Sequence, residues 1–168
     1  MGCDIHMYVE YKITSKDDAV WRCGDYFRIY DPLSEEPKIK RIELYSSRNY
    51  NLFSVLADVR NYDYMEYIAD PRGLPDDATE YVKREYVAWG NDAHSCSYFS
   101  LRELIDYYKD HKPIDEFGYD ILKPLIDRLK QRADELDVIW DFEWTNSLTR
   151  DVAYKKANNI RIVFWFDN

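Results

Sequence analysis

Apolar and polar residues alternate near the N-terminus. Between Asp4 and Ile13, the apolar residues Ile5, Met7 and Val9 occupy every second position. Successive side chains of a β-strand point to opposite faces, so this spacing predicts a strand with one buried face.

Three further segments have the character of strands. Aromatic and β-branched residues favour a strand over residues 20–30, interrupted at Gly24-Asp25, and a short one over residues 38–44. The segment Ile160–Phe166 is apolar at all but one position. Such a run is typical of a central strand that is buried on both faces.

Apolar residues with helical spacing lie between these strands. Leu52, Val55, Leu56 and Val59 follow the i, i+3, i+4, i+7 pattern and predict an amphipathic helix over residues 50–60. Both prolines of the segment 70–75 disfavour a helix there, which predicts an ordered loop.

Two later helices carry capping-box signatures. Asp77 with Glu80 predicts a helix that runs to about Trp89 and ends at Gly90. Ser100 with Glu103 predicts the start of the next helix.

A longer helix is expected from about Tyr119 to Leu136. Pro124 is tolerated in its first turns or marks its true start. Strands, then helices, then a final strand predict one α+β domain over residues 1–168. We expect a single, mainly antiparallel sheet that contains both terminal strands as neighbours, with about four helices mostly on one face.

The composition argues against a partner that is duplex nucleic acid. The formal net charge is −9, and nucleic-acid binding depends on neutralising phosphates. The densest basic run, Lys38–Arg41, is short and is expected to be the solvated face of a strand. Aromatic residues make up 17% of the chain, which suits either core packing or contact with a ligand.

Cysteine usage and hydropathy favour a cytoplasmic protein. Cys3, Cys23 and Cys96 are odd in number and form no C-x-x-C motif, which favours a reducing compartment. No stretch reaches the roughly 20 apolar residues of a membrane span, and no secretory leader is recognisable. The oligomeric state is left open, a homo-oligomer included.

The first candidate site is Asp4 with His6. On a strand the two side chains share a face, so the carboxylate can orient the imidazole, or both can bind a metal. The alternative is an ordinary polar stripe facing solvent.

The second candidate site is His94-Ser95-Cys96. If the segment is extended, His94 and Cys96 share a face. Together with His6 they would supply imidazole and thiolate ligands suited to zinc, and either Asp4 or Asp92 could complete the set. The alternative is a loop whose polar side chains bind the backbone.

The third candidate site combines Arg48 and Asn49, just before a predicted helix, with Arg72 on the proline-rich loop. Helix N-termini attract anions, and guanidinium groups bind phosphate or carboxylate. The alternative is that each arginine pairs with one of the many carboxylates of the chain.

Five blocks of the sequence resemble a family of small uncharacterised proteins from bacteriophages and bacterial genomes. The family often has a second His where this chain has Cys96. The resemblance implies a phage or prophage setting and no activity. The blocks are Met1–Glu10, Arg48–Arg60, Pro71–Asp76, Trp89–Tyr98 and Ile160–Asn168.

Three functions remain open. The first is binding of a small anionic, nucleotide-like ligand, for example to sequester a host immune signalling nucleotide. The second is a metal-dependent hydrolase of phosphoesters, and the third is a protein-binding adaptor. The first two require that the candidate residues converge on one concave surface. Those residues are Asp4, His6, Arg48, Arg72 and His94.

Overall fold

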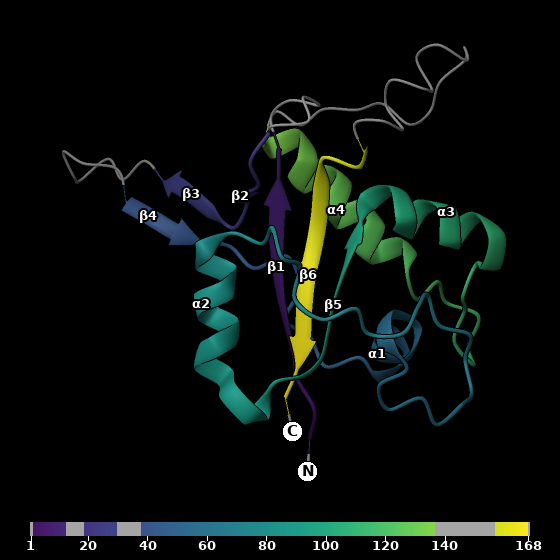
Figure 1. Cartoon of the computed structure of the whole chain (residues 1–168). Coiled ribbons are helices and arrows are strands. Elements are labelled where there is room, and N and C mark those ends of the chain that lie inside the picture. The colour runs from purple at the N-terminus through teal and green to yellow at the C-terminus, as the bar shows by residue number, and fades with distance from the viewer. Residues whose placement is uncertain (1, 13–18, 30–37, 137–156, 168) are drawn as a thin grey trace, which may run out of the picture.

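The computed structural model describes residues 2–12, 19–29, 38–136 and 157–167, and it contains one four-stranded antiparallel sheet (Figure 1). The strand order is β2-β1-β6-β5. The strands are β1 (Ile5–Tyr11), β2 (Arg22–Cys23), β5 (His94–Ser100) and β6 (Ile160–Phe166). As predicted, Gly24-Asp25 interrupts the second strand segment, which divides into β2 and β3 (Tyr26–Ile29).

β6 is the central strand of the sheet, as its apolar sequence predicts. It pairs with β1 along its whole length, from Ile5 opposite Phe166 to Tyr11 opposite Ile160, and with β5 on its other side. Every residue of β6 is buried. The prediction that the N-terminal and C-terminal strands are neighbours is therefore confirmed.

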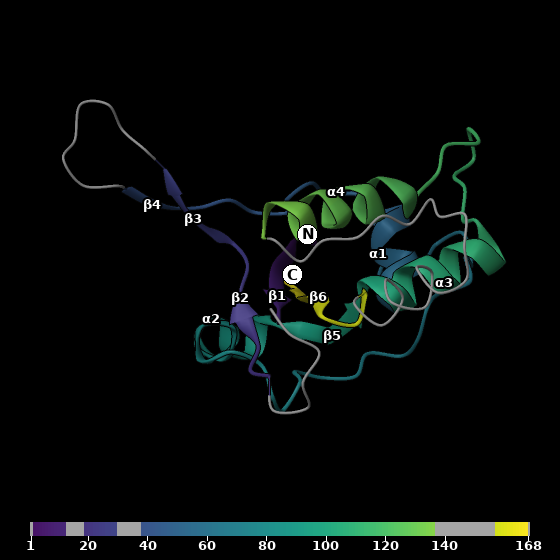
Figure 2. The same ribbon diagram turned by 90° about the horizontal axis from the view of Figure 1, so that it is seen from above.

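Helices cover both faces of the sheet, three on one face and one on the other. α1 (Tyr50–Ala57), α3 (Leu101–His111) and α4 (Lys123–Glu135) contribute to the larger core, which also receives Ile5, Met7 and Val9 of β1. α2 (Glu80–Trp89) packs on the opposite face (Figure 2). The expected α+β class, with most helices on one face, is confirmed.

The two predicted capping boxes have different outcomes. Ser100 and Glu103 cap α3 reciprocally, as predicted. α2 instead begins after Thr79, whose side chain accepts a hydrogen bond from the Val82 amide. Asp77 lies outside the helix because its carboxylate binds Arg161, at 2.8 Å, and the indole of Trp21. The capping role predicted for Asp77 is therefore wrong.

The other predicted helices are shorter than expected. α1 ends at Ala57 because Asp58 adopts a left-handed conformation, and α4 begins at Lys123 with Pro124 in its first turn. The segment 70–75 forms a loop, as its prolines predict. The predicted strand end at Ile13 and the residues 30–37 lie outside the described part of the chain.

β5 is a strand that the sequence pattern did not reveal. His94–Ser100 is largely polar, yet it pairs with β6. The pairing shifts between His94 and Ser97, and Ser95 has a positive φ of 50°. An extra residue in one strand of an antiparallel pair is a β-bulge, which changes the face to which the preceding side chains point.

A two-stranded ribbon projects from the body of the molecule (Figures 1 and 2). It pairs β3 with β4 (Lys38–Arg41). Lys38 and Lys40 are exposed, as expected for a solvated basic run. At its base, the buried Arg132 of α4 donates hydrogen bonds to Asp25 and to the carbonyl of Ile42, which fixes the ribbon to the body.

Candidate functional site

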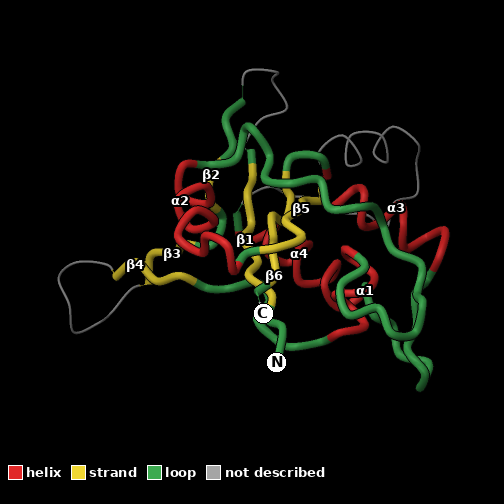
Figure 3. Tube along the Cα trace, turned by 60° about the horizontal axis from the view of Figure 1, so that its bottom comes forward, coloured by secondary structure: helices red, strands yellow, loops and turns green. Residues whose placement is uncertain are grey.

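The two ends of the described chain lie side by side at one end of the sheet (Figure 3). The Asp4 amide donates to the Asp167 carboxylate at 3.0 Å, and the Asp167 amide donates to the Asp4 carbonyl at 3.1 Å. These bonds continue the β1–β6 ladder beyond its last strand pair. They also hold one oxygen of the Asp167 carboxylate in a defined position.

The other oxygen of Asp167 binds His6. His6 Nε2 lies 2.9 Å from Asp167 Oδ2, and both side chains are about four-fifths buried, with exposed fractions of 22% and 18%. The imidazole lies against the ring of Trp89, with centroids 4.0 Å apart, and stacks on Trp165 at 6.1 Å. A carboxylate and two rings therefore fix the orientation of this imidazole.

Arg48 closes the outer side of this cluster. Its guanidinium donates to both oxygens of Asp4, at 2.8 and 2.6 Å. This bond, more than any other influence, holds the pKa of Asp4 below its usual value. The guanidinium also lies against Gly2, where an added Cβ would come within 2.5–2.9 Å of it. Any larger residue at position 2 would have to displace Arg48.

Asp4, His6, Trp89 and Asp167 border a pocket of about 330 Å³. One wall is the N-terminal half of β1, and the opposite wall is the segment that follows β4. The pocket is lined by Asp4, Ile5, His6, Met7, Arg41, Glu43, Tyr45, Ser46, Trp89 and Asp167. Its volume falls at the lower end of the range for small-molecule sites.

Arg41 supplies the fixed positive charge among the described residues that line the pocket. Its Nη1 pairs with Glu43 at 2.9 Å, and its guanidinium carbon lies 4.3 Å from the centre of the Tyr8 ring. Its Nε is buried and has no hydrogen-bond partner among the described residues. A buried donor without a partner costs about 1–3 kcal/mol.

The expectation that all the candidate residues converge on one concave surface is wrong, because the structure brings together only part of the set. Asp4, His6 and Arg48 converge, and Asn49 follows directly in the chain. Asn49 acts as the N-cap of α1 and accepts a hydrogen bond from the Leu52 amide at 3.2 Å. Its side-chain oxygen is therefore already engaged in the fold.

Arg72 lies on the far side of the sheet from this pocket. It donates to Glu103 at 2.7 Å and to the Tyr98 carbonyl, beside the outer strand β5. The strand order is β2-β1-β6-β5, so β5, β6 and β1 lie between Arg72 and the pocket. The alternative reading of Arg72, an arginine paired with a carboxylate, describes what the structure shows.

His94 and Cys96 point to opposite faces of the sheet, contrary to the expectation for a regular strand. His94 stacks on Phe166 of the larger core, whereas Cys96 packs beneath α2 with Val82 and Trp165. The bulge at Ser95 is the physical reason. Burial raises the pKa of the Cys96 thiol to about 12, which disfavours the thiolate that zinc requires.

The described residues contain no group of three or more His, Cys, Asp or Glu side chains that could hold a metal ion. The proposed zinc ligands Asp4, His6, His94 and Cys96 are therefore not assembled into one site. His6 lies against Trp89 of α2 and Trp165, whereas His94 stacks on Phe166 of the larger core.

Sequence reasoning missed several residues of the pocket. Asp167 could have been found. It is two positions after Trp165, so it would share that face of β6, and the expected pairing of the two terminal strands would place it near His6. Arg41, Glu43 and Trp89 carry no comparable signal. They reach the pocket only through the tertiary placement of the segment after β4 and of the end of α2.

No protein-family model, no curated protein and no solved structure matches this chain. In the part of the chain that the structure describes, no helix has the length and apolar character needed to cross a membrane.

Proposed function

We propose that this protein binds a small, nucleotide-like ligand with an anionic group in the pocket between β1 and the segment after β4. The convergence first expected for such a site fails at Arg72 and His94, so the proposal rests instead on the lining of this pocket. It combines an imidazole held by a carboxylate, the Trp89 ring and the guanidinium side chain of Arg41. Rings and convergent polar groups are typical of sites for such ligands.

The charges of the pocket limit how much negative charge a ligand can carry. Asp4, Glu43 and Asp167 contribute three carboxylates, which Arg41 and Arg48 offset only in part. One anionic group can approach Arg41, but a polyphosphate would meet more negative charge than the pocket can compensate. We therefore expect affinity to fall as the number of phosphate charges rises.

Isothermal titration calorimetry with 3′,5′-cyclic AMP, AMP and ATP tests the proposal. We expect the singly charged cyclic nucleotide to bind most tightly and ATP least. Arg41→Met should weaken binding about 10-fold to 100-fold, because a hydrogen bond to a charged group contributes about 1.5–3 kcal/mol.

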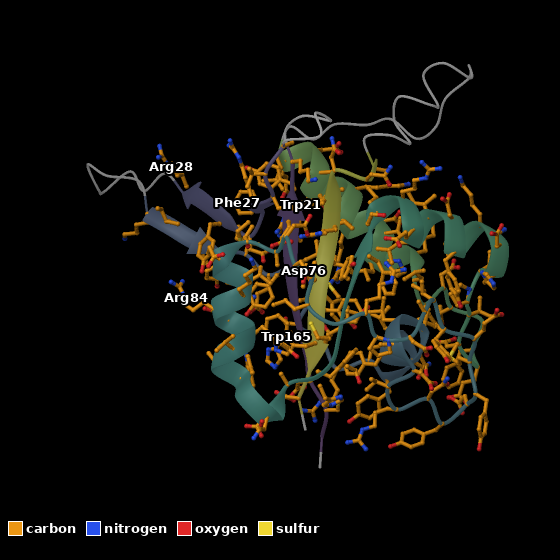
Figure 4. All side chains as sticks on the ribbon, viewed as in Figure 1. Trp21, Phe27, Arg28, Asp76, Arg84 and Trp165 are labelled. Carbon is orange, nitrogen blue, oxygen red and sulfur yellow. The ribbon has the colours of Figure 1, made fainter. Side chains whose placement is uncertain are left out.

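Arg28→Met is the matched control for this substitution. Arg28 lies on the projecting ribbon, near Arg41 in the sheet but outside the pocket (Figure 4). It should leave the affinity unchanged. Tightest binding of ATP, equal effects of the two substitutions, or no binding of any of the three nucleotides would contradict the proposal.

A further inference from the structure

The orientation of His6 suggests a chemical role beyond ligand binding. Asp167 accepts a hydrogen bond from Nε2, and a carboxylate in this position favours the tautomer with its proton on Nε2. Nδ1 is then the basic nitrogen. None of the residues that the structure describes forms a hydrogen bond to Nδ1, and His6 lines the pocket.

The surroundings of His6 restrict its movement. Asp167 is itself held by the Asp4 amide, and the imidazole is flanked by the rings of Trp89 and Trp165. Figure 4 shows Trp165 in the body of the molecule beside α2. A side chain fixed in this way needs little reorganisation before it accepts a proton, which is what a general base requires.

We propose that His6 is a general base that activates water against a phosphodiester bound in the pocket. This inference rests on the proposed function, because it needs the nucleotide-like ligand to occupy the pocket. A phosphodiester carries one negative charge, the smallest charge that an anionic ligand can have. Arg41 would lie beside that charge, where it would offset the negative charge that develops in the transition state.

The step balances without an oxidant or reductant. Nδ1 takes a proton from water as the water oxygen forms a bond to phosphorus. The phosphorus–oxygen bond to the leaving group breaks, and the leaving oxygen takes a proton from solvent. The product is a phosphomonoester, and the imidazolium then returns its proton to solvent. Asp167 acts as a positioning residue, because it orients the imidazole and stabilises its charged form.

Hydrolysis of bis(p-nitrophenyl) phosphate and of 3′,5′-cyclic AMP by the full chain tests the inference. His6→Gln should lower the rate by about 10²-fold to 10⁴-fold, the usual contribution of general-base catalysis. His111→Gln is the control, since His111 lies at the end of α3 and pairs with Glu66.

Asp167→Asn tests the positioning role with a readout other than rate. An amide at this position can donate to Nε2, which would move the proton to Nδ1 and remove the base. The chain has three histidines, so the ¹⁵N resonances of His6 can be assigned by substitution. We expect the Nε2–H tautomer in the wild-type protein and the Nδ1–H tautomer in the variant.

The outcomes separate this inference from the proposed function. Calorimetric binding of 3′,5′-cyclic AMP with no hydrolysis of either substrate would overturn the catalytic role and leave the binding proposal standing. Hydrolysis that persists in His6→Gln, or an Nδ1–H tautomer in the wild-type protein, would also overturn it. Absence of binding would contradict both.

Discussion

At the scale of single residues, several charged side chains act by joining distant segments. Arg161 is buried and pairs with Glu10 of β1 and with Asp77 before α2. Arg132 connects α4 to the base of the ribbon in the same manner. Removing one partner of a buried pair leaves an uncompensated charge, which commonly costs about 3–5 kcal/mol.

Asp25 makes the stability of the ribbon base depend on pH. Burial raises the pKa of Asp25 to about 6, above its ordinary value of 3.8, although Arg132 lies 3.0 Å away. The folded state therefore holds this proton more tightly than the unfolded chain does. The resulting stabilisation is present below about pH 4 and is lost as the pH rises through about 6.

Asp25→Asn, which mimics the protonated carboxyl, should gain stability relative to the wild-type protein as the pH rises. We expect a relative gain of about 1–3 kcal/mol in the free energy of unfolding between pH 4 and pH 7.5. Urea unfolding of both proteins at the two pH values measures it. A relative loss in the variant over this range would mean that the ion pair with Arg132 outweighs burial.

Residue patterns revealed part of the candidate site and not the rest. The alternation near the N-terminus predicted that Asp4 and His6 lie together, and both line the pocket. The sequence pattern could not reveal Arg41 or Trp89. These residues are distant from β1 in the sequence, and their spacing carries no information on which strand they contact in the folded protein. Nor could it reveal the bulge at Ser95, since a positive φ is uncommon for a residue other than glycine.

At the scale of elements, predictions succeeded where one local signal dominates. The period-3.6 stripes of α1, α3 and α4 and the apolar run of β6 identified these elements. β5 was not predicted because its strand conformation depends on pairing with β6. This is a tertiary interaction that its own polar sequence does not indicate. α2 was found, but its start was misplaced because Asp77 has a tertiary partner.

The capping box of α3 provides a test at this scale. The Ser100 side chain accepts from the Glu103 amide at 3.2 Å, and the Glu103 carboxylate accepts from the Ser100 amide at 2.8 Å. Ser100→Ala should therefore lower the free energy of unfolding by about 0.5–2 kcal/mol. Chemical denaturation measures the change.

Ser100→Thr is the control for the capping prediction, since threonine also caps helices well. It should retain most of the stability. An alanine variant as stable as the wild-type protein would show that the packing of α3 against the sheet, and not its cap, determines where the helix begins.

At the scale of the whole molecule, the first and last strands depend on each other. Asp4 and Asp167 are in direct contact although 163 positions separate them. β6 provides hydrogen-bond partners for both β1 and β5, so it connects the two sides of the main sheet. Contacts between such distant residues are slow to form during folding.

A chain that ends at residue 159 should not fold. It would lose the central strand, which leaves β1 and β5 without their shared neighbour and exposes the larger core. We expect no cooperative unfolding transition and a weak near-ultraviolet circular dichroism signal.

A synthetic peptide of residues 160–168, added to the shortened chain, is the complementary measurement. It should restore the near-ultraviolet signal, because it supplies the missing strand. A shortened chain that unfolds cooperatively without the peptide would show that β6 is dispensable for the core.

The pairing of Asp4 with Asp167 also determines when the pocket can exist during protein synthesis. The ribosome makes His6 some 160 positions before Asp167, so the nascent chain carries the imidazole without the Asp167 carboxylate that orients it. The pocket is complete only after β6 has emerged and inserted between β1 and β5. Unfinished chains therefore cannot bind ligand through this pocket, and the onset of binding would report that translation has passed Asp167.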